Sequence, residues 1–136
     1  MILSGAMRML LPPLILLFGL TCCIIAVLHI LFGLSWVPDA GDFTATLDSE
    51  DRFYAAMFFG FGAAAIWCSR DIPARRNVLG FLMSIFFLGG IARLFSLAAH
   101  GWPHPLFIAL GAIELVLPPI VWWWSGLVAE GAQTSA

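Results

Sequence analysis

Long apolar runs constrain this chain more than any other feature of its sequence. They predict membrane spans at residues 9–37, 50–69, 78–99 and 105–128, because about 20 residues of helix cross the hydrocarbon core of a bilayer. Only 10% of the 136 residues are charged, whereas a soluble domain carries about a quarter. We therefore predict an all-α integral membrane protein in which residues 1–136 form one domain, a four-transmembrane-helix bundle.

The second span has the shortest apolar stretch, which runs only over residues 53–68. The segment Asp48-Ser49-Glu50-Asp51 precedes this stretch, and such residues favour the N-cap and first turn of a helix. We expect the second helix to begin at this segment, in the headgroup layer. Strand-like alternation is absent from the sequence, which disfavours a barrel.

The arginines indicate the orientation of the spans. Arg8 precedes the first span, and Arg70, Arg75 and Arg76 lie between the second and the third, while Arg52 alone flanks a span on the other side. Positively charged loops stay in the cytoplasm, so we predict an N-in/C-in topology. The formal net charge of −2 offers no basic surface for a phosphate backbone, which excludes a nucleic acid as partner.

The N-terminal run and the cysteines have simple interpretations. The run is longer than the 7 to 15 residues of a signal-peptide core, so we expect a retained helix. Cys22, Cys23 and Cys68 fall within predicted spans, where small packing residues are expected rather than disulfides. No metal or cofactor is predicted, because a haem between His29 and His100 would have to bridge about 10 Å in depth.

The charged residues and the histidine inside the predicted spans all fall in the outer half of the membrane. At 1.5 Å per residue, His29 and Arg93 lie roughly 10 Å below the outer surface and Glu114 roughly 13 Å below it. Uncompensated charges at such depths are costly. We therefore predict that Arg93 and Glu114 pair, either as a structural ion pair that fixes helix register or as part of a ligand or ion site.

Helical spacing predicts which faces carry these groups. Gly89, Arg93, Ser96 and His100 form one stripe, and Arg52 ends a small-residue stripe made by residues 56, 60 and 64. Small residues allow membrane helices to approach closely, so Gly60 and Arg52 are expected to face the bundle. These faces predict one outward-facing cavity that His100 and His104 could close. Its candidate ligand-binding residues are His29, Glu50, Arg52, Tyr54, Arg93, Ser96, His104 and Glu114.

The same positions carry a resemblance to a known family. The chain resembles the bacterial membrane proteins grouped as domain of unknown function 4345, through the ordered set Glu50, Arg52, Arg93, Ser96, His104 and Glu114 and the motif Glu114-Leu115-Val116-Leu117-Pro118-Pro119. The resemblance implies a multi-pass protein of the bacterial inner membrane with four spans. It implies no activity, substrate or cofactor.

Three classes of function remain open from the sequence. The favoured hypothesis is a binding or transport-related protein whose cavity takes a small amphiphile, a lipid or an anion, with Arg52 and Arg93 as contacts and Glu114 as counter-ion. The alternative is an accessory or structural subunit that packs on a larger membrane complex or on copies of itself. A membrane enzyme is the least favoured, because no catalytic set of residues is visible.

Overall fold

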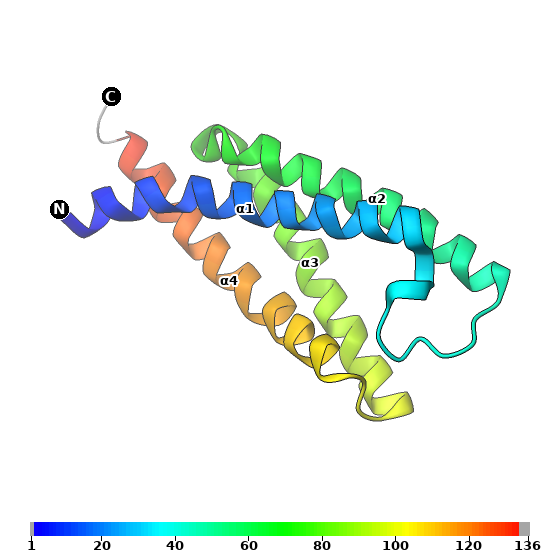
Figure 1. Ribbon diagram of the computed structural model, residues 1–136. Coiled ribbons are helices and arrows are strands. Elements are labelled where there is room, and N and C mark those ends of the chain that lie inside the picture. The colour runs from blue at the N-terminus through cyan, green and yellow to red at the C-terminus, as the bar shows by residue number, and fades with distance from the viewer. Residues whose placement is uncertain (1, 134–136) are drawn as a thin grey trace. The chain divides into compact units, whose positions relative to one another are not determined.

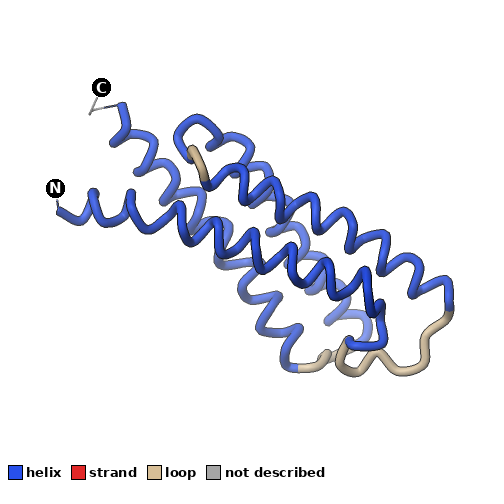
Figure 2. Tube along the Cα trace, turned by 45° about the horizontal axis from the view of Figure 1, so that its top comes forward, coloured by secondary structure: helices blue, strands red, loops and turns tan. Residues whose placement is uncertain are grey.

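The computed structural model describes residues 2–133 and is built from helices throughout that range (Figure 1). They are α1 (Ile2–Phe32), the short 3-10 helix η1 (Gly33–Trp36), α2 (Ala45–Ser69), α3 (Ile72–His100) and α4 (Pro105–Gln133). Short loops connect them (Figure 2). The predicted all-α class is confirmed for this part of the chain, which contains no strand.

Three of the helical segments are long and apolar enough to cross a membrane. They are Arg8–Trp36, Ile72–His100 and Pro105–Gln133, each of 29 residues. Helix α2 is not among the spans found in the described residues, since its first turns carry the charged residues of 48–52. The chain is thus a helical membrane protein.

The helix starts correct two sequence expectations. Helix α2 begins at Ala45 rather than at Asp48, because the hydroxyl of Thr44 caps it by accepting a hydrogen bond from the Leu47 N–H at 3.3 Å. Helix α3 begins at Ile72, six residues before the predicted span, because the Asp71 carboxylate accepts from the Ala74 N–H at 3.2 Å. Both are ordinary side-chain N-caps.

Contacts divide the chain into two compact units, each described by itself. The first, residues 13–70, holds most of α1 together with η1 and α2, and is called here the first hairpin. The second combines residues 71–133 with the start of α1, and its α3 and α4 form the second hairpin.

Glycine brings α1 and α2 together in the first hairpin. A Cβ added to Gly19 would lie 2.7 Å from the Gly62 carbonyl oxygen, and one added to Gly62 would lie 2.7 Å from the Cys23 sulfur. Added to Gly60, it would meet no described atom within 4 Å. Gly60, which the sequence predicts to face the bundle, therefore does not mark the contact face in this hairpin. Gly62, two positions and roughly 200° further around the helix, marks it instead.

Glycine also sets the spacing of α3 and α4 in the second hairpin. A Cβ on Gly90 would lie 2.8 Å from the Leu115 side chain, and one on Gly80 would overlap the ring of Trp122. Close approach at both positions holds the two helices together over the ~15 Å of α3 that separates these glycines. This alignment sets the levels at which their polar residues meet.

Candidate functional site

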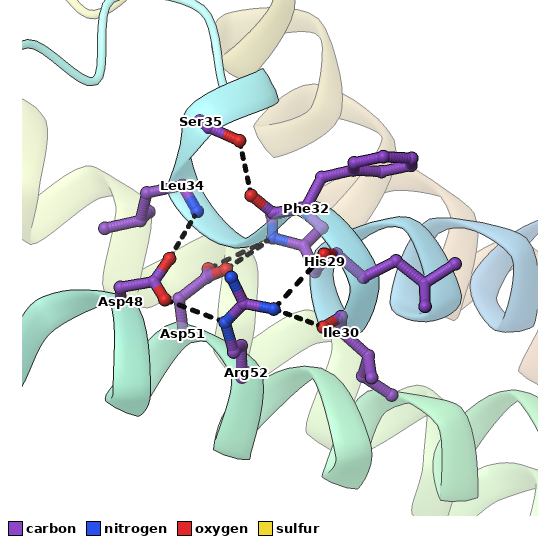
Figure 3. A network of polar contacts seen from close by, with 9 residues as sticks. His29, Ile30, Phe32, Leu34, Ser35, Asp48, Asp51 and Arg52 are labelled. Atoms are coloured by element: carbon purple, nitrogen blue, oxygen red, sulfur yellow. Dashed lines mark hydrogen bonds and ion pairs between the residues drawn. The ribbon is translucent and has the colours of Figure 1, made fainter. Parts of the chain in front are cut away.

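Four polar side chains gather where α1 ends and α2 begins (Figure 3). They are His29, Asp48, Asp51 and Arg52, and are called here the hairpin cluster. The Arg52 Nε–H donates to Asp48 at 2.7 Å, while Arg52 Nη1 donates to the carbonyls of Ile30 at 2.5 Å and Leu31 at 3.3 Å. Arginine thus satisfies carbonyls that the end of a helix leaves without partners.

Asp48 holds the chain that follows α1. Its carboxylate accepts a hydrogen bond from the Leu34 N–H at 3.1 Å. Gly33 has φ +57°, and a Cβ there would overlap the Asp48 carboxylate, so this position requires glycine for two reasons. The hydrogen bonds from Arg52 and from the Leu34 N–H hold the pKa of Asp48 below its usual value.

His29 pairs with Asp51 across the same hairpin. Its Nδ1 lies 2.9 Å from Asp51 Oδ2, and the ring of Trp36 packs edge-on against the imidazole with centroids 5.1 Å apart. The His29 and Asp51 side chains are only 24% and 19% exposed. The polar groups of the hairpin cluster are therefore paired with one another and with the end of α1, as expected of a structural contact between two helices.

The second hairpin contains the pair that depth along the helices predicts. Arg93 Nε lies 2.6 Å from Glu114 Oε2, and the Arg93 guanidinium lies over the ring of Phe107, 5.7 Å from its centroid. A Cβ added to Gly111 would lie 3.4 Å from Arg93 Cδ, an ordinary van der Waals distance, so the arginine stem lies against α4 at this position.

The two partners of this pair differ in exposure. The Glu114 side chain is 10% exposed and that of Arg93 is 40% exposed. A guanidinium carries five N–H donors, yet within residues 2–133 only the Nε–H of Arg93 donates a hydrogen bond. The N–H donors of Arg93 Nη1 and Nη2 are therefore open to a further acceptor, while Glu114 fixes the position of Arg93.

The remaining candidate residues lie apart from these pairs. Glu50, Tyr54 and Ser96 are exposed, and none of them belongs to the hairpin cluster or to the Arg93–Glu114 pair. His104 Nδ1 accepts a hydrogen bond from the Leu106 N–H at 3.2 Å, so it caps the start of α4. Glu50 was predicted to belong to the site, whereas Asp48 and Asp51 make the contacts in the structure. The spacing of Asp48 and Arg52, four residues apart on one helix, is the signal that could have found Asp48.

Across residues 2–133 there is no group of three or more His, Cys, Asp and Glu side chains that could hold a metal ion. Cys22, Cys23 and Cys68 form no disulfide within the described residues.

The helical fold and its ion pairs define a helical membrane protein whose helices carry charged side chains. Residues 10–125 match the family described as Domain of unknown function (DUF4345). The match covers most of the chain, so the chain belongs to this family, as its residues had indicated. Searches of the curated proteins and of the solved structures found no significant match.

Proposed function

We propose that α2 is a fourth span, and that the four helices form a bundle in the bacterial inner membrane with both termini in the cytoplasm. The support is the distribution of arginine: Arg8, Arg70, Arg75 and Arg76 fall on the predicted inner side, which is the distribution of cytoplasmic loops. The charged start of α2 then lies in the outer headgroup layer, with Arg52 satisfied there by helix carbonyls.

Reporter fusions test this topology. A reporter inserted at Gly41 should register an external location, and one inserted at Arg75 a cytoplasmic location. The reverse pattern would overturn the orientation. Two insertions that register the same side would show that α2 does not cross the membrane.

We further propose that the protein binds a small amphiphile with an anionic headgroup, and that Arg93 is the residue that contacts the headgroup. The observation that carries this proposal is that Glu114 pairs only with Nε of Arg93. The Nη1 and Nη2 donors of the guanidinium have no described acceptor. A charged residue inside a membrane-spanning helix is costly and by default marks a functional site. Phe107, beside the guanidinium, supplies an apolar surface for the adjoining chain of the ligand.

Of the eight candidate residues chosen from the sequence, only Arg93 is proposed to contact the ligand. Arg52 and His29 are engaged within the hairpin cluster, by Asp48 and helix carbonyls and by Asp51 respectively. Their role in the proposal is to fix the turn between α1 and α2. Glu114 is a positioning residue, since it holds Arg93 at its Nε and leaves the far side of the guanidinium open.

Binding of octyl phosphate to the protein in phosphatidylcholine nanodiscs tests the function, with octyl glucoside as the uncharged comparison. Wild type should bind octyl phosphate saturably. Arg93→Gln should bind at least tenfold more weakly, because a hydrogen bond to a charged group is worth about 1.5–3 kcal/mol and 1.4 kcal/mol is a factor of ten. Arg70→Gln, which removes an exposed cation at the end of α2, is the matched control and should bind as wild type does.

Two results would contradict the proposal. One is equal affinity of wild type and Arg93→Gln for octyl phosphate, and the other is equal binding of octyl phosphate and octyl glucoside by wild type. Arg93→Lys adds a finer test. Lysine keeps the charge but lacks the planar fork of donors, so its affinity should fall between those of wild type and Arg93→Gln.

A further inference from the structure

A groove runs along the second hairpin at the end opposite Arg93. It has a volume of about 440 Å³ and is lined by residues of α3 and α4, among them Asn77, Phe81, Phe87, Pro119 and Trp122. From Asn77 to Phe87 the groove extends about 15 Å along α3 at 1.5 Å per residue. That length equals half of the ~30 Å hydrocarbon core, or one leaflet. The groove therefore has the length and the apolar character that suit a lipid acyl chain.

An arginine lies at one end of this groove. The Arg76 guanidinium stacks on the ring of Trp122, 3.9 Å from its centroid, and Trp122 itself lines the groove. Gly80 makes this arrangement possible, because a Cβ there would overlap the same ring. Tryptophan is enriched at the level of the lipid headgroups, so Trp122 and Arg76 mark the headgroup end.

The charge on Arg76 has no counter-ion in the described part of the chain. Its Nε is buried and has no hydrogen-bond partner there, and none of the ion pairs in residues 2–133 involves it. Asn77, the next residue, adds an exposed amide at the mouth of the groove. A cation stacked on an aromatic ring beside an open amide suits a phosphate group.

We propose that this groove is a binding site for a phospholipid with a net negative headgroup. The phosphate lies at Arg76 and Asn77, and one acyl chain lies along Phe81 and Phe87 against α4. The site is about 25 Å from Arg93 along α3, at 1.5 Å per residue. It is separate from the proposed amphiphile site and does not depend on it.

Native mass spectrometry with an equimolar mixture of phosphatidylglycerol and phosphatidylcholine, matched in their acyl chains, tests this proposal. Wild type should retain phosphatidylglycerol in preference to phosphatidylcholine. Arg76→Gln should lower the retention of phosphatidylglycerol about fivefold, which is what one arginine near an anionic lipid surface is worth. Arg75→Gln removes the neighbouring cation and should leave the preference intact. Equal retention of the two lipids by wild type, or equal losses in the two variants, would overturn the proposal.

Two further variants separate this site from others. Ser84→Phe places a ring in the groove, which Ser84 lines, and should lower the retention of both lipids. Arg93→Gln should leave phosphatidylglycerol retention unchanged even where it abolishes octyl phosphate binding, so the two proposals can fail independently.

A measurement on the folded wild-type chain covers the case in which a variant does not fold. Phosphatidylglycerol with brominated acyl chains should quench tryptophan emission more than brominated phosphatidylcholine, and Trp122→Phe should remove the difference. Equal quenching by the two lipids would contradict the site.

Discussion

Removing Arg93 should lower the stability of the protein more than removing Glu114. In Arg93→Leu the Glu114 carboxylate loses its partner while its side chain is 10% exposed. Breaking a buried pair costs about 3–5 kcal/mol, and we expect the lower end, about 3 kcal/mol. In Glu114→Leu the remaining charge belongs to a side chain that is 40% exposed. Arginine can extend its head toward water, so the expected loss is about 1 kcal/mol, typical of an exposed pair.

The double variant distinguishes a real interaction from two independent losses. Arg93→Leu with Glu114→Leu leaves no orphan charge, so its stability should lie within about 1 kcal/mol of wild type, well short of the ~4 kcal/mol sum of the single losses. Unfolding of the purified protein in mixed detergent, followed by far-UV circular dichroism, measures these differences. Ser96→Leu, at an exposed position of the same helix, is the control and should change little. Losses that add would refute the pairing.

Two other predictions concern the first hairpin. Gly62→Leu should destabilise the protein by about 1–3 kcal/mol, the range for overpacking. Gly60→Leu should have little effect on its thermal stability, since Gly60 has open space around it. Similar melting temperatures for the two variants would show that the glycine contacts do not hold α1 to α2. The Asp48 carboxyl has its pKa lowered by folding, so its stabilisation is present above the unfolded value of about 3.9 and is lost as the pH falls through the folded value. Below about pH 4 the stability of wild type should therefore fall more steeply than that of Asp48→Asn, and parallel pH profiles would contradict the bond to Arg52.

The level at which Arg93 and Glu114 meet could be predicted from the sequence because only residues 101–104 separate α3 from α4. A short connection fixes the register of two antiparallel helices, and counting 1.5 Å per residue from it gives comparable depths. In the structure Arg93 Nε lies 2.6 Å from Glu114 Oε2, as these depths predict. The family could also be predicted, since the residues that carry the resemblance are spread along the chain.

The packing face of α2 could not be predicted in the same way. This helix has small residues on two faces, one marked by Gly60 and the other by Gly62. The spacing of small residues identifies both faces equally, and only the position of Gly19 and Cys23 on α1 selects the second. The two aspartates of the hairpin cluster were missed because they have another explanation. Acidic residues in a first helical turn have a sufficient local explanation, which hid the contacts of Asp48 and Asp51 with α1 and η1.

The most direct test of Arg93 as the headgroup contact is an experimental map of the protein in a nanodisc with octyl phosphate present. We predict density for the phosphate within hydrogen-bond distance of the outer guanidinium nitrogens of Arg93, with Nε still paired to Glu114. A map in which those nitrogens donate to Glu114 or to another helix, with no density beside them, would contradict it.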